Sequence, residues 1–187
     1  MAKEIPGVEV LPLDTADESA PSKVFGVLKP DILILCAGAF PPAAPLHEQS
    51  WQQFAVNWET DVKIALHFCK AALSEPLPGG ASVILISSGT ALAGSPNSGG
   101  YAGAKRTQLF IANYSQKESD RLGLGLRFSA LAPRIMPAKP RRSQNTVLPS
   151  PIVILPACKN GPAPLSARSL IGGRKPSLGR SYLTSAL

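Results

Sequence analysis

The sequence predicts an α/β fold in which helices cover both faces of a parallel sheet. Short runs of apolar residues rich in Val, Ile and Leu alternate along the chain with longer segments of helical periodicity. This alternation is typical of βαβ units with right-handed crossovers. Because the runs are apolar on both faces, they indicate strands that are covered on both sides. The predicted class is a three-layer αβα arrangement.

Each predicted element has a local reason in the sequence. Ser50 is a preferred N-cap residue, Pro21 limits the helix around it, and Pro133 ends the last strand. Gly123 closes the longest helix, as glycine does at many helix ends. In order, the predicted elements are a strand at 8–13, a helix at 17–27, a strand at 31–35, a short helix after Ser50, a long helix at 58–73, a strand at 82–87, a helix at 101–121 and a strand at 126–131.

The carboxyl ends of the predicted strands carry polar or flexible residues. Asp14, Ala37-Gly38, Ser88 and Pro133 each follow an apolar run. In open parallel sheets, ligands bind in the crevice beyond the carboxyl ends of the strands. These residues are therefore predicted to meet at one edge of the sheet, where a ligand would bind.

Charge divides the 187-residue chain into two parts. The net charge is +7, but residues 139–187 contain eight Lys or Arg and no Asp or Glu, which leaves residues 1–138 at about −1. The tail is also rich in Pro and Ser and is predicted to be largely disordered, with one strand-like run at 151–156. A basic tail could contact nucleic acid or anionic lipid, but a solvated tail is the more common outcome, so neither partner is predicted.

No feature of the sequence predicts a membrane span, a secretory signal or a metal site. No apolar run approaches the ~20 residues that cross a bilayer, and the first residues lack an apolar signal segment. Cys36, Cys69 and Cys158 are odd in number and widely spaced. They are interpreted as reduced thiols, and a cytoplasmic location is predicted.

Ser88, Tyr101 and Lys105 form the pattern with the clearest chemistry. Residues at i and i+4 share a helix face, so Lys105 lies beside Tyr101, and Ser88 at a strand end can reach that face. A phenol titrates near ~10, and an adjacent ammonium lowers that pKa toward the range where proton transfer is efficient. The set could move a proton to or from a substrate oxygen while hydride moves at the adjacent carbon.

With these motifs the chain resembles the short-chain dehydrogenase/reductase family over about residues 5–138. The motifs that carry the resemblance are, in order, Asp14, Cys36-Ala37-Gly38, Asn57, Ile86-Ser87-Ser88, Tyr101-xxx-Lys105 and Leu131-Ala132-Pro133. The resemblance implies a partial Rossmann-like, doubly wound parallel sheet at 1–138, followed by the tail at 139–187. It also implies NADP or NAD as cofactor and a small-molecule carbonyl or alcohol as substrate. Helices at Asn57 and Tyr101 often form the family's interfaces, so a homo-oligomer is compatible with it.

The resemblance implies a role for each matching residue. Tyr101 would donate or accept the proton, Lys105 would lower the pKa of Tyr101 and bind the nicotinamide ribose, and Ser88 would orient the carbonyl. Asn57 would support a water in a proton relay. The remaining cofactor-binding candidates are Asp14, Ala37, Gly38 and Lys70. Simpler interpretations stay open for three of these residues: Asn57 or Asp14 could cap a helix, and Lys70 could be a solvated helix residue.

The chain also departs from the family pattern. No Thr-Gly-xxx-Gly-x-Gly turn precedes Asp14, Cys36 replaces the usual Asn, and Arg134 replaces the usual Gly. The Gly-rich turn holds the cofactor pyrophosphate at a helix N-terminus. The predicted function is therefore an NAD(P)-dependent oxidoreductase with a Ser-Tyr-Lys mechanism. The alternative is an inactive, shortened form or an interaction protein without the pyrophosphate site.

Overall fold

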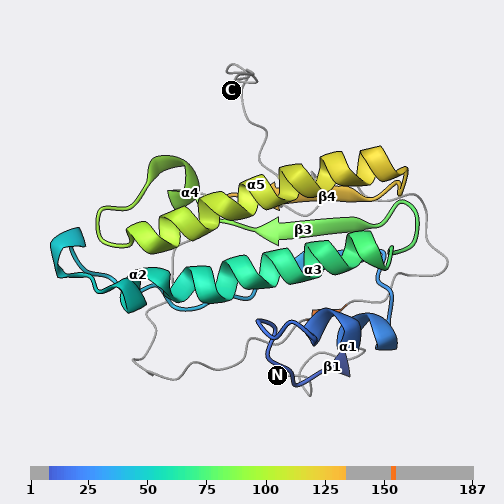
Figure 1. Cartoon of the computed structure of the whole chain (residues 1–187), viewed down its shortest axis with the longest axis horizontal. Coiled ribbons are helices and arrows are strands. Elements are labelled where there is room, and N and C mark those ends of the chain that lie inside the picture. The colour runs from blue at the N-terminus through green and yellow to red at the C-terminus, as the bar shows by residue number, and fades with distance from the viewer. Residues whose placement is uncertain (1–8, 134–152, 155–187) are drawn as a thin grey trace, which may run out of the picture. The chain divides into compact units, whose positions relative to one another are not determined.

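Three parallel strands form the central sheet of the protein, seen here in a computed structural model that describes residues 9–133 and 153–154 (Figure 1). The strands are β2 (Ile32–Leu35), β3 (Ser82–Ile86) and β4 (Arg127–Leu131), and they lie in the order β2-β3-β4. Leu33 pairs with Val83, and Val83 pairs with Phe128. The predicted α/β class with a parallel, partial Rossmann-like sheet is confirmed.

Helices connect the strands and lie along the sheet. They are α1 (Ala20–Val27), a 3₁₀ turn η2 (Leu46–Glu48), α2 (Trp51–Asn57), a π-helical turn η3 (Trp58–Val62), α3 (Lys63–Ser74), α4 (Thr90–Ala93) and α5 (Gly99–Leu122). Figure 1 shows α3 and α5 side by side along the strands. The strand order follows the chain order, so successive crossovers of one hand bring both helices to the same face of the sheet.

The helix ends follow local sequence signals. Ser50 and Gln53 form a capping box, in which the Ser50 hydroxyl accepts from the Gln53 N–H and the Gln53 side chain accepts from the Ser50 N–H. Pro21 lies in the first turn of α1, where its missing N–H costs nothing. Gly123 ends α5 with a positive φ of 65°, a conformation that glycine adopts without strain.

The core lies between the helices and one face of the sheet. Phe25 of α1 and Phe68 of α3 meet edge to face, with ring centroids 6.1 Å apart and planes at 83°. Small residues on α5, including Ala104 and Ala112, let this helix approach the sheet closely. The sheet contributes alternate residues, which are Leu33, Leu35, Val83, Leu85 and Phe128.

The other face of the sheet is open among the described residues. Ile32 is 55% exposed, Ile34 43% and Leu131 52%. These residues alternate with the core residues along their strands, as the pleat requires. The described helices thus cover one face of a sheet whose strands are apolar on both faces.

The predicted strand at 8–13 is shorter than expected and does not join the parallel sheet. β1 (Glu9–Val10) pairs antiparallel with β5 (Val153–Ile154), which falls within the strand-like run of the predicted tail. Pro12 has no N–H with which to continue the pairing, and Leu11 and Leu13 pack partly buried against the core instead. Apart from β5, the predicted tail lies outside the described residues.

Among the residues that the structure describes, no helix is both long and apolar enough to cross a bilayer.

Candidate active site

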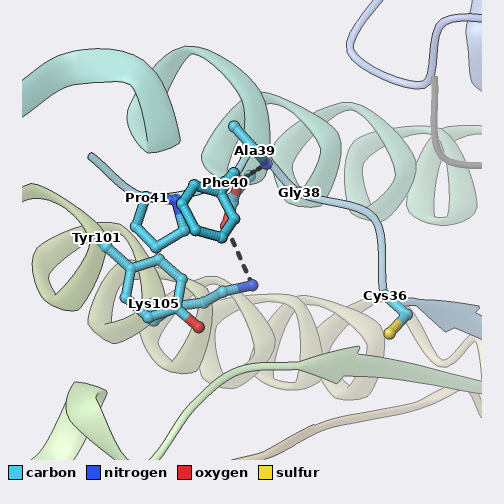
Figure 2. Close-up of a pocket in the computed structure, with 8 residues that line it drawn as sticks. Cys36, Gly38, Ala39, Phe40, Pro41, Tyr101 and Lys105 are labelled. Carbon is cyan, nitrogen blue, oxygen red and sulfur yellow. Dashed lines mark hydrogen bonds and ion pairs between the residues drawn. The ribbon is translucent and has the colours of Figure 1, made fainter. Parts of the chain in front are cut away.

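A cavity of about 240 Å³ opens at the carboxyl ends of the strands (Figure 2). The loop that follows β2 forms one wall, η3 contributes one side chain, and the first turns of α5 contribute two. The lining residues are Cys36, Gly38, Ala39, Phe40, Pro41, Asp61, Tyr101 and Lys105. Four of these lining residues belong to the sequence motifs named above. They are Cys36, Gly38, Tyr101 and Lys105.

Tyr101 and Lys105 lie one turn apart on α5, with the Lys105 Nζ 5.7 Å from the centre of the Tyr101 ring. Gly100, just before Tyr101, lets the helix start close to α2, since a Cβ at Gly100 would lie 2.1 Å from the Phe54 carbonyl oxygen. Tyr101 is half-buried and Lys105 is buried. The predicted shared face is therefore present, and it is directed into the cavity (Figure 2).

Residues at the end of β3 bind both the side chain and the backbone of Lys105. Its Nζ donates to the Ile86 carbonyl at 3.1 Å, and its backbone carbonyl accepts from the Ser87 hydroxyl at 2.7 Å. Nζ also lies 3.1 Å from Oδ2 of Asp61 in an ion pair whose two side chains are 7% and 1% exposed. The contact with Asp61 is an ion pair and not a hydrogen bond, since Oδ2 of Asp61 has no hydrogen-bond partner among the described residues.

Asp61 is a site residue that the sequence interpretation missed. Its Oδ1 accepts from the Ala39 N–H at 2.9 Å and from Asn57 Nδ2 at 3.3 Å. Asp61 lies in the π-helical turn η3. Its backbone carbonyl accepts a hydrogen bond from Gln108 Nε2 at 3.2 Å. π turns inside helices occur often at functional sites. The signal in the sequence was the Asn57/Asp61 pair at i and i+4, the same spacing as Tyr101 and Lys105.

Asn57, the last residue of α2, is held by a hydrogen bond to the loop after β2. Its Nδ2 donates to the Ala39 carbonyl at 2.9 Å, and the residue is 1% exposed. No side-chain capping bond from Asn57 to η3 is present, so the simpler interpretation as a helix cap does not describe its contacts. Asn57 and Asp61 together bind both backbone polar groups of Ala39.

Gly38 is close to the Asp61 carboxylate. A Cβ at position 38 would lie 2.8 Å from each carboxylate oxygen of Asp61. The glycine at this position thus makes room for the Asp61 carboxylate. The family resemblance implies a different reason for the glycine, namely a close approach of the cofactor to the backbone. Ala37, beside it, packs partly buried against the core.

Three other candidates are not among the residues that line the cavity. The Ser88 hydroxyl, directly after β3, accepts from the N–H and the hydroxyl of Thr90 at 3.3 and 3.1 Å. Asp14 accepts from the Ala16 N–H at 2.9 Å in the turn before α1, which fits its simpler interpretation as a local cap. Lys70 is exposed on α3, 3.9 Å from Glu18.

The groups that line the cavity can bind the hydroxyls of a sugar. An ammonium, a phenol and the backbone of Gly38-Ala39 line it, and these groups can bind ribose hydroxyls. Its volume of about 240 Å³ is below the ~300–1,000 Å³ of typical ligand sites.

Residues 1–133 match a family model described as enoyl-(acyl carrier protein) reductase. The fold, the Tyr101-Lys105 site and this match identify the class, and the chain belongs to the short-chain dehydrogenase/reductase family. None of the curated proteins matches the chain.

Solved structures share the fold at low sequence identity. A short-chain dehydrogenase from Mycobacterium avium matches with a TM-score of 0.57 and 20% identity, over 64% of this chain and 45% of that one. A short-chain dehydrogenase/reductase of the glucose/ribitol dehydrogenase type from Brucella melitensis matches with a TM-score of 0.58 and 20% identity, over 66% and 50%. An NAD⁺-bound xylitol dehydrogenase matches with a TM-score of 0.56 and 22% identity, over 65% and 48%. The chain spans about half the length of these proteins.

Proposed function

We propose that the chain carries the proton-transfer site of an NAD(P)-dependent oxidoreductase that interconverts a carbonyl and an alcohol on a small organic molecule. The observation that carries the proposal is the Tyr101 phenol and the Lys105 ammonium lining one cavity at the carboxyl ends of the strands. Two of the similar structures, an NAD⁺-bound xylitol dehydrogenase and a 4-hydroxyisoleucine dehydrogenase complexed with NADH, support a nicotinamide cofactor. Either NAD or NADP is compatible with the described residues.

In this proposal each residue has a stated task. Tyr101 donates the proton to the carbonyl oxygen during reduction and accepts it from the alcohol during oxidation. Lys105 favours the ionised phenol through its charge and binds a ribose hydroxyl. A bound nicotinamide supplies or accepts the hydride. Ser88 orients the substrate oxygen, and Asn57 supports a water in the relay.

The remaining candidates bind the cofactor in this proposal. Ala37 and Gly38 would border its path along the loop after β2. Asp14 and Lys70, which do not line the cavity, would contact its adenine end. The protein acts on a small molecule as a cytoplasmic enzyme, with residues 1–138 as the catalytic part and a homo-oligomer as the compatible assembly.

The test begins with a fluorescence titration of the folded full-length chain with NADH and NADPH. Saturable binding supports the proposal and is followed by a screen of ketones and alcohols. Absence of binding by a folded, monodisperse sample contradicts it and favours the inactive form or the interaction protein.

A matched pair of variants then tests the catalytic assignment. Tyr101→Phe removes the proton donor and should lower turnover by roughly 10²-fold or more, with cofactor binding retained. Tyr114→Phe is the control, because Tyr114 lies on the same helix and its side chain is exposed. Equal activities of the two variants would contradict the role of Tyr101.

A further inference from the structure

Asp61 is a buried charge that the proposed Tyr101-Lys105 chemistry does not require. It is 0% exposed, and its carboxylate contacts the Ala39 N–H, the Asn57 side chain and the Lys105 ammonium. Burying a carboxylate is costly, and a buried ion pair often stabilises no more than apolar residues of the same volume would. A contribution to folding is therefore a weak explanation for a carboxylate at this position.

The titratable groups that face the cavity come from three elements. The loop after β2 contributes the Cys36 thiol, η3 contributes Asp61, and α5 contributes Tyr101 and Lys105. The guanidinium of Arg106, next to Lys105 in sequence, lies 3.4 Å from the Ala91 carbonyl and is not among the lining residues. Among the described residues, the charge of Lys105 is thus balanced by that of Asp61 alone.

We propose, on the basis of the proposed function, that Asp61 is a positioning residue that holds the Lys105 ammonium beside Tyr101 and balances its charge. Asp61 holds the Lys105 ammonium, which also donates to the Ile86 carbonyl, beside the loop at Ala39. Its negative charge offsets part of the effect of Lys105 on Tyr101. Asp61 thereby fixes both the position and the charge balance of the Lys105 ammonium.

The sign of the effect separates this role from a purely structural one. Asp61→Asn keeps the size of the side chain but removes its charge, so Lys105 remains with an uncompensated positive charge near Tyr101. A positive charge favours phenolate, so Asp61→Asn should shift phenolate formation at Tyr101 to lower pH. If Asp61 served only to support the fold, its loss would loosen Lys105, and ionisation would stay unchanged or move to higher pH.

The experiment is a pH titration of phenolate formation by ultraviolet difference absorption on the full-length chain. Tyr101→Phe is titrated in parallel, and its signal is subtracted to isolate Tyr101 from the other tyrosines. The control is Asp31→Asn, which makes the same chemical change at an exposed residue before β2. A downward shift in Asp61→Asn and none in Asp31→Asn is the expected result, and an unchanged or higher midpoint in Asp61→Asn overturns the proposal.

A second pair of variants covers the case in which Asp61→Asn does not fold. Lys105→Met leaves the Asp61 carboxylate unbalanced, whereas Lys105→Met combined with Asp61→Asn removes both charges. Tyr101 should ionise at a higher pH in Lys105→Met than in the double variant, because an unbalanced carboxylate disfavours phenolate. Equal midpoints in the two variants overturn the proposal.

The titration needs neither cofactor nor substrate, so it is independent of the proposed function. Wild-type protein that binds no NADH or NADPH would contradict the proposed function and leave the titration result standing. Where turnover is measurable, the pH profile of Asp61→Asn should shift in the same direction as the titration.

Discussion

The apolar core under α3 and the polar cluster beneath the cavity are both buried, but different forces hold them. Phe68 and its neighbours in the core make contacts that depend on volume and area. The polar cluster consists of Asn57, Asp61, Ser87, Lys105 and Gln108, and each of these side chains has a particular partner atom. Apolar packing tolerates a replacement of similar volume. In a polar cluster, each replacement leaves a buried polar atom without its hydrogen-bond or ion-pair partner.

The largest expected contrast between the two regions is in thiol reactivity. Burial raises the pKa of the Cys69 thiol to about 12, although a hydrogen bond with Ser115 opposes the shift. Cys36 lies exposed at the cavity. Because the thiolate is the reacting species, Cys69 should react with iodoacetamide at least ~10²-fold more slowly than Cys36 at pH 8. Mass spectrometry of a Cys158→Ser background measures both rates, and similar rates would show that the core opens readily.

In the core, Phe68→Ala should have the largest effect on stability. Phe68 is 0% exposed and contacts Phe25, so its truncation leaves a cavity and should lower the free energy of unfolding by about 3–5 kcal/mol. Phe110→Ala is the matched control, since Phe110 is 46% exposed. Urea denaturation measures both variants, and equal losses would contradict the placement of Phe68.

Beside the polar cluster, Gly38→Ala should lower the free energy of unfolding by less, about 1–3 kcal/mol, because the added Cβ would press on the Asp61 carboxylate. The control is Gly26→Ala in α1, where a Cβ meets nothing within 4 Å. Alanine is favoured over glycine inside a helix, so this control should stabilise the chain by about 0.5–1 kcal/mol. Stabilisation by both changes would show that Asp61 does not occupy the space beside Gly38.

The smallest effect is expected on the open face of the sheet. Ile34→Thr should change the free energy of unfolding by no more than about 0.5 kcal/mol, because Ile34 is 43% exposed and Thr suits a strand. Leu35→Thr, its neighbour on the packed face, buries a hydroxyl and should cost several times more. A loss at Ile34 as large as at Leu35 would mean that this face is covered in the whole protein.

The sequence predicted the elements of the fold well because their signals are local. The apolar runs of β2, β3 and β4, the N-cap at Ser50 and the glycine end at Gly123 all lie where the pattern placed them. The strand at 8–13 was less well predicted. Its alternating pattern is compatible with either sheet, and whether it pairs with the parallel strands or with β5 depends on contacts with distant residues.

The site was predicted in part. The i, i+4 spacing placed Tyr101 and Lys105 together, because helix geometry fixes that relation. Asp61 was missed, because its partners Ala39 and Lys105 lie 22 and 44 residues away and no spacing rule links them. Its position also depends on a π-helical turn that helical periodicity does not predict.

By itself the sequence determined the order of the main strands and helices, the helix ends at Ser50 and Gly123 and the shared face of Tyr101 and Lys105, since these follow from contacts between near neighbours in the chain. Only the tertiary structure decided that Asp61 balances Lys105, that Gly38 makes room for a carboxylate and that the described helices gather on one face of the sheet. The physical reason is that burial removes these groups from water. Once water no longer satisfies a charge or a polar atom, its partner must come from whichever residue the fold brings near.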